Sequence, residues 1–433
     1  MSLLSSLFSG VTGLTAYGNA MSVIGNNIAN VNTTGFKSGR PIFEDILSQN
    51  LGASSQVGRG VEMQSVDTVF QQGSFETTEN ITDLAIDGAG FFVVKDQTGQ
   101  FYTRAGDFHF DKDGYLVNPS GLRLQGKAVD PTGLAIGSIV DISIGSSTAP
   151  PQPTGDGVIA GSGITVAANL DSRSTIPLLP FSATNANNTS NFSTSVSVFD
   201  SLGNAHLLNI YFRKAAVNSW EFHVTADGSE LAGGTPGVQQ EIGAGGTLDF
   251  TTDGLLNSQS VNQLTFNFSG GATPGQVIGF NFGDPITAGG TGRNGITQYG
   301  STSAVAFQKQ DGYTLGSLRN IAIDQSGRIT GIFTNGQTLN LYQIFLADFK
   351  NPGGLTKQGK NMFAQSVNSG DPIIGPPGTS GKGSITSNSL EMSNVDLAAE
   401  FVKMITTQRG FTANTRVIST SDQMLTELVN LKR

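Results

Sequence analysis

The sequence contains no cysteine, and few of its residues are charged. Without cysteine, disulfides, thiolate metal sites and cysteine nucleophiles are all excluded. Charged residues make up 13% of the chain, against about 25% in typical soluble domains, so Ser, Thr, Asn, Gln and Gly must supply most of the solubility. The formal net charge is -9 and the pI is about 4.8, which argues against nucleic-acid binding.

Long apolar runs are absent as well. No run reaches the roughly 18 residues of a membrane span, so we expect no membrane insertion. The first ten residues, MSLLSSLFSG, lack the basic segment that opens a cleaved signal peptide. The protein is therefore expected either to remain inside the cell or to leave by a route that reads no such signal.

Side chains that carry out most enzyme chemistry are scarce and scattered. The three histidines, His109, His206 and His223, have no metal-binding spacing. Residues 290–295 match the pattern GxGxxG, but no helical pattern follows, and dinucleotide binding requires one. Residues 111–114 are similar to a calcium loop that lacks its glutamate ligand. We therefore expect no catalytic residue, no metal and no cofactor, and the protein is predicted not to be an enzyme.

The last stretch, residues 393–433, contains no proline and a single glycine, in a chain with 57 glycines. Its apolar residues recur at alternating spacings of four and three, which predicts a helix with a narrow apolar stripe, as in a coiled coil. Ser393 and Asp396 have capping-box spacing and mark the predicted helix start. A helix of about 60 Å, at 1.5 Å per residue, requires a partner helix. The predicted seam residues are Leu397, Phe401, Met404, Phe411, Ile418, Leu425 and Val429.

The first thirty residues carry a second seam of the same spacing. Its predicted members are Leu4, Leu7, Val11, Leu14, Met21 and Ile28. Four glycines lie within it, at positions 10, 13, 18 and 25, and each costs about 1 kcal/mol of helix stability relative to alanine. Alone, such a helix would be marginal, but its glycines would permit close approach to the C-terminal helix. The alternative is an amphipathic helix packed on its own domain; seams at both ends favour pairing of the two ends.

Between the two ends the sequence is predominantly β. Alternating apolar and polar residues predict strands at 195–199, 207–212 and 220–224, the first two joined through a turn at residues 200–203. Turn residues also predict hairpins at 111–114 and at Asn335 and Gly336. The predicted fold is multi-domain and mainly β, with paired, coiled-coil-like terminal α-helices and β domains nested as insertions between the termini. The predicted parts are a terminal helical core (1–30 and 393–433), an irregular or extended connecting region (31–72 and 360–392), a first β domain (73–146 and 300–359) and a second, outer β domain (147–299).

Several segments resemble the axial proteins of the bacterial flagellum, the rod and hook group. At the N-terminus the resemblance lies in GNNIANVNTTGFK, residues 25–37. The family motif within it consists of Asn30, Asn32, Thr33, Thr34, Gly35, Phe36 and Lys37. Further matching segments follow in the same order at 84–93, 102–108, 121–126, 393–397, 407–411 and 428–433. The segments 198–206, 343–349 and 354–359 are similar to the hook proteins in particular.

The resemblance implies a structural subunit of the flagellar hook, which self-assembles into a curved, hollow helical tube and acts as a universal joint between rod and filament. It implies a homopolymer that meets the rod, the hook cap, the hook-filament junction proteins and the flagellar type III export apparatus, without nucleic acid or membrane insertion. It places the protein outside the cell, in the hook attached to the basal body, after export without a cleaved signal peptide. The terminal helices would pair in the innermost layer. Some hook proteins cross-link through a cysteine, which this chain lacks.

Two alternatives remain open at this point. One is a distal rod subunit with an enlarged β insert, and the other is a secreted β-rich adhesin or enzyme whose ends match by chance. In the hook interpretation the two seams carry torque, while weakly charged outer surfaces slide over their neighbours through many weak polar contacts. Replacing Phe401 or Ile418 by Asp is then expected to abolish polymerisation and to leave the β domains folded.

Overall fold

The computed structural model describes residues 3–47, 49–52, 55–130, 133–145, 147–159 and 161–430. The chain forms two compact units. The terminal unit consists of Met1–Ser147, Asn320–Ile332 and Thr338–Arg433, and the central unit consists of Thr148–Arg319 and Phe333–Gln337. The central unit thus begins next to residue 147, where the sequence predicts the start of the outer β domain. The finer division into four nested parts stays a prediction.

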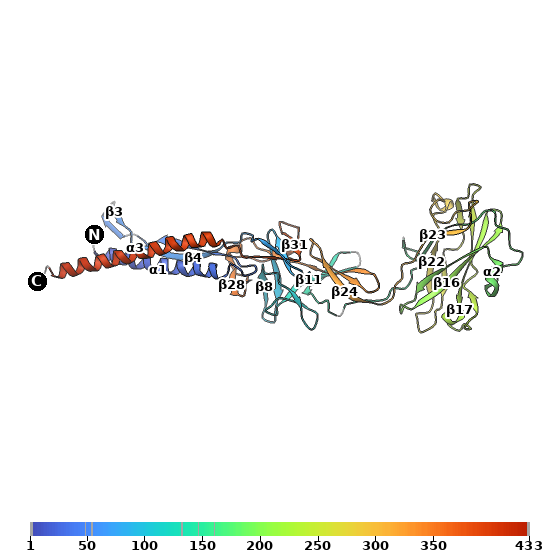
Figure 1. Cartoon of the computed structure of the whole chain (residues 1–433), viewed down its shortest axis with the longest axis horizontal. Coiled ribbons are helices and arrows are strands. Elements are labelled where there is room, and N and C mark those ends of the chain that lie inside the picture. The colour runs from blue at the N-terminus through green and yellow to red at the C-terminus, as the bar shows by residue number, and fades with distance from the viewer. Residues whose placement is uncertain are drawn as a thin grey trace. The chain divides into compact units, whose positions relative to one another are not determined.

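Two long helices of the terminal unit lie side by side, α1 (Leu3–Ala29) and α3 (Leu397–Asn430) (Figure 1). The Asp396 carboxylate accepts hydrogen bonds from the amides of Ala398 at 2.9 Å and Ala399 at 3.2 Å. These amides have no carbonyl partner in the first turn, so α3 begins directly after Asp396. The predicted start at Ser393 is wrong, because the Ser393 hydroxyl accepts a bond from the Val395 amide, ahead of the helix.

An antiparallel hairpin packs on α1 and consists of β1 (Gly39–Asp45) and β4 (Val61–Thr68). Gly60, directly before β4, lies close to the helix, because a Cβ there would lie 2.0 Å from Thr12 Oγ1. Between the two strands lie β2 (Gln49–Gly52) and β3 (Ser55–Val57), which pair with each other. The segment expected to be irregular or extended therefore supports the N-terminal helix.

The β part of the terminal unit takes strands from both halves of the sequence. The pairings that join the halves include β5 (Phe75–Thr77) with β32 (Ser389–Glu391), β6 (Leu84–Asp87) with β31 (Ser384–Ser387), β7 (Phe91–Lys95) with β27 (Leu346–Asp348), β8 (Gln100–Thr103) with β29 (Met362–Ala364), and β11 (Arg123–Val129) with β26 (Thr338–Ile344). The buried aromatic rings of Phe91, Tyr102, Phe349 and Phe363 form the core between these halves. The two ends of the chain are thereby held in one folded body.

Other strands belong to the sheet that contains β7 and β27, whereas β5 with β32 and β6 with β31 form separate two-stranded sheets. These other strands are β8 (Gln100–Thr103), β9 (His109–Phe110), β10 (Leu116–Val117), β11 (Arg123–Val129), β12 (Ala135–Asp141), β25 (Arg328–Phe333), β26 (Thr338–Ile344), β28 (Thr356–Gly359), β29 (Met362–Ala364) and β30 (Ile373–Gly375). β24 (Gly316–Ile323) runs from the central into the terminal unit, and its first residues pair with β13 (Thr148–Ala149) inside the central unit. A short 3-10 helix, η4, spans Pro352–Gly354.

The central unit contains two β-sheets. The first has the order β21 (Gln263–Phe266), β22 (Gln276–Asn281), β14 (Ile164–Asn169), β23 (Ala304–Lys309). The second has the order β15 (Phe192–Phe199), β16 (Ala205–Ala216), β17 (Ser219–Asp227), β19 (Gly246–Phe250), β20 (Leu256–Gln259), with β18 (Gln239–Glu241) also paired to β17. Short helical turns are η1 (Ala183–Asn185), α2 (Ala186–Thr189), η2 (Gly228–Glu230) and η3 (Ile286–Ala288).

Alternation of buried and less buried residues along β16 and β17, broken at the buried Thr225, builds the core of the central unit. Every second residue is buried, including Ile210 and Phe212 on β16 and Trp220 and Phe222 on β17, because successive strand side chains point to opposite faces. The Trp220 indole donates to Gln298 Oε1 at 2.8 Å, so its polar group is satisfied within this core.

The predicted hairpins are confirmed. β9 pairs with β10, β15 with β16 and β25 with β26, all antiparallel. Their turns contain Gly114 (φ +80°), Gly203 (φ +83°) and Gly336 (φ +79°), a left-handed conformation that glycine adopts without steric cost.

Candidate functional site: the terminal helix pair and its charge junction

The helices α1 and α3 run antiparallel, and one register accounts for the contacts between them. The residue number rises along α1 as it falls along α3. The contacting pairs are Ser6 with Ser421, Gly10 with Ile418, Gly13 with Asn414, Tyr17 with Gly410, and Asn27 with Glu400. The expected pairing of the two chain ends is confirmed.

Two glycines of α1 let the helices approach closely. A Cβ added to Gly10 would lie 2.9 Å from Ile418 Cγ1, and one added to Gly13 would lie 2.6 Å from Asn414 Oδ1. Both distances are shorter than an ordinary van der Waals contact, so a larger residue at either position would force the helices or the facing side chains to move.

The single glycine of α3 completes the close approach. A Cβ on Gly410 would lie 2.7 Å from the ring of Tyr17. Gly18 and Gly25, in contrast, have no heavy atom within 4 Å of the Cβ position. The expectation that the N-terminal glycines permit close approach therefore holds for two of the four.

The surface of α3 that faces α1 combines a polar row with an apolar row, each repeating every seven residues. The polar row is Glu400, Thr407, Asn414 and Ser421, and the apolar row is Met404, Phe411, Ile418 and Leu425. Three members of the polar row, at positions 400, 407 and 421, are at most 8% exposed. The apolar row was predicted. The sequence also predicted a second row, which contains Phe401, in the place of the polar row. Each residue of that second row follows a polar-row residue by one position and is therefore rotated by about 100° around the helix axis.

The predicted seam residues divide between buried and exposed positions. Partly buried are Leu7, Leu14, Met21, Ile28, Met404, Ile418 and Leu425. Exposed are Val11 (49%), Leu397 (39%), Phe401 (50%), Phe411 (36%) and Val429 (68%). The side chain of Leu4 lies outside the described residues. The expectation that Phe401 faces α1 is wrong, because Glu400 takes that place and binds Asn27. The role of all these residues in self-assembly stays a prediction.

Asn27 connects both helices with the first strand. Its amide nitrogen donates to Gly39 O at 2.8 Å and to Glu400 Oε2 at 3.1 Å, and its amide oxygen accepts from Gly39 N at 2.8 Å. Asn27 is 2% exposed and Glu400 4% exposed. Lys403 binds the other oxygen of Glu400 at 2.7 Å. Burial of these polar groups is acceptable only because each is hydrogen-bonded, so the Asn27 contacts fix the register of the pair.

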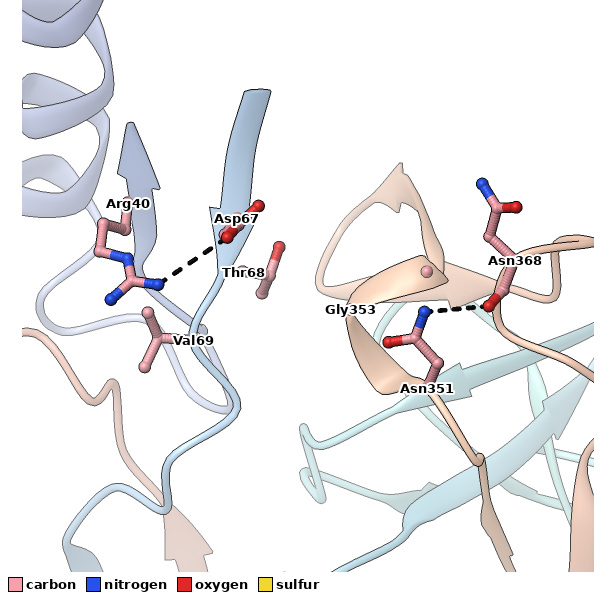
Figure 2. A pocket seen from close by; sticks show the side chains of 8 residues that line it. Arg40, Asp67, Thr68, Val69, Asn351, Gly353 and Asn368 are labelled. Carbon is pink, nitrogen blue, oxygen red and sulfur yellow. Dashed lines mark hydrogen bonds and ion pairs between the residues drawn. The ribbon is translucent and has the colours of Figure 1, made fainter. Parts of the chain in front are cut away.

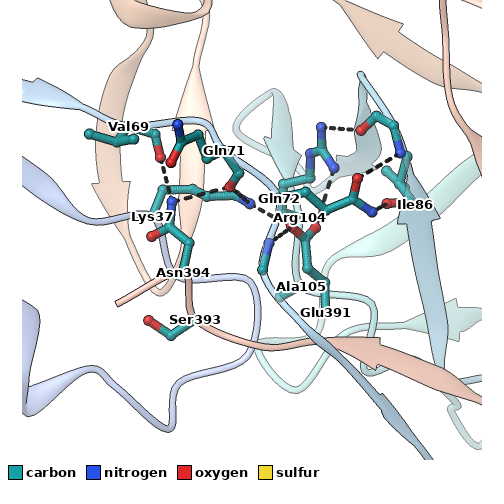
Figure 3. A network of polar contacts seen from close by, with 12 residues as sticks. Lys37, Val69, Gln71, Gln72, Ile86, Arg104, Ala105, Glu391, Ser393 and Asn394 are labelled. Atoms are coloured by element: carbon teal, nitrogen blue, oxygen red, sulfur yellow. Dashed lines mark hydrogen bonds and ion pairs between the residues drawn. The ribbon is translucent and has the colours of Figure 1, made fainter. Parts of the chain in front are cut away.

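A buried carboxylate joins the beginning, the middle and the end of the terminal unit (Figure 3). Glu391 Oε1 lies 2.5 Å from Lys37 Nζ, and Glu391 Oε2 lies 3.3 Å from Arg104 Nη1. The three side chains are exposed by 1%, 0% and 5% for Lys37, Glu391 and Arg104. Burial lowers the pKa of the Lys37 ammonium, and the attraction of Glu391 opposes that effect. Burial likewise lowers the pKa of Arg104 against the same attraction.

Backbone groups add three hydrogen bonds to this junction, whereas the buried Arg104 Nε has no hydrogen-bond partner among the described residues. Lys37 Nζ donates to Gln71 O at 2.8 Å, Arg104 Nη2 donates to Gly88 O at 2.8 Å, and Gly73 N donates to Glu391 Oε1 at 3.0 Å. Removing one member of a buried ion pair costs about 3–5 kcal/mol, because the other charge is left unpaired. The junction therefore requires all three chain segments to be in place together.

The family motif forms the turn between α1 and this junction. Gly35 has φ +67°, and a Cβ there would lie 2.4 Å from Ala105 N. Most of the other contacts of the motif run to its own residues or to the C-terminal half, in addition to the bonds from Lys37 to Gln71 O and from Asn30 to Asn26: Asn30 Oδ1 accepts from Thr33, Thr34 O accepts from Asn361, Gly35 N donates to Glu391 O, Phe36 O accepts from Asn394 N, and Lys37 binds Glu391. Asn32 is exposed. The motif thus binds the C-terminal segment next to the turn that follows α1.

Four family models match consecutive parts of the chain. They are described as Flagella basal body rod protein (residues 7–37), Flagellar hook protein FlgE/F/G D1 domain (85–170), Flagellar basal body protein FlaE D2 domain (169–313) and Flagellar basal body rod FlgEFG protein C-terminal (386–431). The flagellar hook protein FlgE of Treponema pallidum is 41% identical over 100% of both chains, and that of Salmonella typhimurium is 35% identical over 98% of both. The chain belongs to the flagellar hook protein FlgE family.

Membership in the FlgE family favours the hook over the rod alternative, and makes this chain a structural subunit of the hook. Subunits of this family form a homopolymer within the flagellar hook and basal body, exterior to the cell. Among solved structures, the Helicobacter pylori flagellar hook protein FlgE2 matches with a TM-score of 0.49 at 15% identity, over 73% of this chain and 100% of that chain.

The lining of the surface pocket shown in Figure 2 does not resemble a catalytic site. This pocket of about 620 Å³ is lined by Arg40, Asp67, Asn351 and Asn368 among others (Figure 2). The ion pair in it, Arg40 with Asp67 at 3.8 Å, is 64% and 52% exposed, so solvent screens it. Within the described residues, no group of three or more His, Cys, Asp or Glu side chains is placed to hold a metal ion. No described helix is both long and apolar enough to cross a membrane.

Proposed function

We propose that this chain polymerises into the curved, hollow tube of the flagellar hook and acts there as a universal joint, with the α1–α3 pair in the innermost layer. The observation that carries the proposal is the apolar surface that the pair leaves uncovered. Eight large apolar side chains in the described part of α3 are exposed: Leu397 (39%), Phe401 (50%), Val402 (61%), Ile405 (52%), Phe411 (36%), Val417 (41%), Met424 (51%) and Val429 (68%). Exposed apolar residues gathered on one helix in this way mark an interaction site.

The exposed apolar residues lie on both sides of the surface that faces α1. Successive helix residues are rotated by about 100°, so Phe401 and Ile405 project to one side of the Glu400 row, and Val417 and Met424 to the other. A subunit in a closed layer needs neighbours on two sides. In an isolated helix pair, the apolar side chains on both sides of α3 would remain in water. Their distribution therefore supports packing between copies of the chain.

We further infer that the chain is exported unfolded through the flagellar type III apparatus and works outside the cell, in contact with the rod, the hook cap and the hook-filament junction proteins. Half of the α3 positions toward α1 are polar, and α1 contains four glycines. The pair therefore buries little apolar surface by itself, and helices of this kind are marginal without further packing. Folding of the termini on assembly follows from that weakness, and the role requires no catalysis and no cofactor.

The composition of the outer surface supports the universal joint. Rotation of a bent tube requires each subunit to shift against its neighbours as it passes from the inner to the outer side of the curve. With 13% charged residues, the surface offers mainly neutral polar groups, whose contacts are weak and have similar energies at different offsets. Exposed ion pairs such as Lys112 with Asp113 add only about 0–1 kcal/mol, and so they do not lock one offset.

The location can be tested by immunogold electron microscopy of purified hook-basal bodies, with antibody raised against residues 148–319. We expect label along the curved segment outside the membrane rings. Label confined to the straight rod would contradict the universal-joint proposal.

The inner-layer packing can be tested with Phe401→Asp, for which Phe401→Leu is the matched control. Phe401→Asp introduces a charge on the uncovered surface without touching the contacts to α1, so it should abolish the polymer and leave the circular dichroism of the β domains unchanged. Phe401→Leu keeps the site apolar and should still assemble. If Phe401→Asp built normal hooks, this surface would not be an interface.

A further inference from the structure

The segment 172–181 of the central unit is an apolar loop that the fold holds rigidly against the sheet. Cationic and amide side chains bind five of its main-chain carbonyls. Lys214 Nζ donates to Ser172 O (2.5 Å) and Ser174 O (3.0 Å), Asn191 Nδ2 to Thr175 O (2.7 Å), and Arg213 Nη2 to Pro177 O and Leu179 O (both 3.3 Å). The main-chain carbonyls of a surface loop normally face water, whereas these five carbonyls accept hydrogen bonds from side chains of the same chain.

The groups that hold the loop are themselves fixed. Arg213 and Glu221 lie opposite each other on β16 and β17, and Arg213 Nη1 donates to Glu221 Oε2 at 3.0 Å. At the end of the loop, the Phe181 ring stacks on His223 with centroids 4.0 Å apart and an interplanar angle of 6°. Pro177 and Pro180 restrict the backbone further. The loop therefore has little conformational freedom to lose on binding.

Although its backbone is bound, the loop turns its largest apolar side chains to solvent. Ile176 is 48% exposed, Leu179 60% and Leu178 101%. Single exposed leucines are common, but three within four residues on an immobilised loop form a preorganised apolar knob. The folded unit gains nothing from them, since a polar loop could be bound through the same carbonyls.

We propose that the knob formed by Ile176, Leu178 and Leu179 is a contact between neighbouring copies of this chain in the hook polymer. A second copy is the favoured occupant because the family forms a homopolymer, which presents the knob at every repeat. The central unit also offers a different apolar surface: all six residues of β23 are exposed, including Val305 (36%) and Phe307 (52%). A repeating head-to-tail contact needs two such unlike surfaces on one chain.

Charge argues against a membrane as the occupant. The chain carries a net charge of -9, and the cation nearest the knob in sequence, Arg173, is paired with Asp171 at 2.9 Å. Binding to a lipid surface normally adds unpaired basic residues to the apolar ones. This inference rests on the polymer proposed above. Its test uses hooks that electron microscopy has already shown to be tubes, so a negative result would speak against the contact and not against assembly.

The absence of cysteine makes a site-specific test possible, because Leu178→Cys creates the sole thiol in the chain. We expect a maleimide reagent to label this thiol at least about fivefold more slowly in assembled hooks than in monomers, since an interface core excludes water and reagent. Circular dichroism of the monomer checks that the variant still folds. A smaller difference between polymer and monomer would overturn the proposal.

The identity of the occupant follows from a photo-cross-linking amino acid placed at position 178 in the same polymer. The expected product has twice the mass of the 45.1 kDa chain and yields only peptides of this sequence. A product with another protein, a lipid adduct, or no product from intact hooks would each contradict a contact between copies.

Discussion

Replacing Gly10 or Gly13 by alanine should weaken the terminal helix pair, whereas the same replacement at Gly18 or Gly25 should strengthen it. All four glycines lie in α1, so the chemical change and the secondary structure are identical. Only the space at the Cβ position differs. At Gly10 and Gly13 the new methyl group would meet atoms of α3 at 2.9 Å and 2.6 Å, and at Gly18 and Gly25 it would meet none within 4 Å.

The magnitudes follow from two opposing terms. Alanine in a helix is favoured over glycine by about 1 kcal/mol, and this gain is common to all four variants. Overpacking a close contact costs about 1–3 kcal/mol. At Gly10 the facing atom is Cγ1 of Ile418, a β-branched residue with few allowed rotamers, so the cost should be near the upper end. The flexible end of Asn414 faces Gly13, so the cost there should be smaller. Relative to the Gly18 variant, the Gly10 variant should therefore lose about 1–3 kcal/mol.

The assay is urea dissociation of assembled hooks, followed by the helical circular dichroism signal and by sedimentation. The urea midpoints of Gly18→Ala and Gly25→Ala should lie above the midpoint of the parent chain. The midpoint of Gly13→Ala should lie below that of the parent chain, and the midpoint of Gly10→Ala should be the lowest. Subtracting the Gly18 value from the Gly10 value cancels helix propensity and leaves the packing cost. If all four variants were stabilised alike, the close approach of α1 and α3 would be refuted.

Three further predictions concern other parts of the fold. Glu391→Gln leaves Lys37 and Arg104 without a counter-charge and should destabilise the terminal unit by about 3–5 kcal/mol in urea unfolding, whereas the control Asp67→Asn, in an exposed ion pair, should change it by less than about 1 kcal/mol; equal effects would contradict the buried junction. Asn27→Ala should increase hydrogen exchange at the Gly39 amide, which the Asn27 side chain binds, while Asn32→Ala, at an exposed position, should not. Burial raises the pKa of the Asp200 carboxyl, but hydrogen bonds from Asn204, His206 and two backbone amides outweigh it and leave the pKa below its ordinary 3.8. The unfolded chain therefore binds the proton of Asp200 more tightly than the folded chain does. The stability that Asp200 contributes is present above pH 3.8 and is lost as the pH falls through the lowered pKa. Asp200→Asn should therefore flatten this part of the acid unfolding curve, and an unchanged curve would contradict the assignment.

Local patterns in the sequence were sufficient to predict the hairpins and both helices. The turns at Gly114, Gly203 and Gly336 need a left-handed residue between alternating strands, and this requirement is visible within a few residues. The alternation at 220–224 likewise placed Trp220 in a strand, and the structure buries it. Such features depend on neighbours in sequence, so a single chain displays them.

The row of α3 that faces α1 could be predicted only in part, for a physical reason. Apolar periodicity points to the side of a helix that is to be buried by any partner, including another copy. On α3 the most apolar side, with Phe401 and Ile405, is exposed in the single chain, while Thr407 and Ser421 are buried. Pairing with a glycine-containing helix selects small and polar residues, and a hydrophobicity pattern does not distinguish them from solvent-exposed ones.

The charge junction could not be predicted from the sequence. Lys37 precedes Glu391 by 354 residues and Arg104 precedes it by 287, and charged residues are seldom fully buried. Sequence reasoning singled out Lys37 through the resemblance alone, without a partner. The available signal was indirect: a charged residue at the end of a glycine-containing turn motif, in a chain with few charges. The role of Asn27 was missed in the same way, since an asparagine within a helix normally indicates an exposed position.

The most direct test of the central claim is an electron cryomicroscopy reconstruction of purified hooks at side-chain resolution. We expect the innermost layer to consist of α1 and α3 as an antiparallel pair in the register that places Gly10 against Ile418 and Asn27 against Glu400, with Phe401 and Ile405 packed on a neighbouring subunit. An inner layer in which these helices pair in another register, or in which Phe401 faces the open channel, would contradict the account.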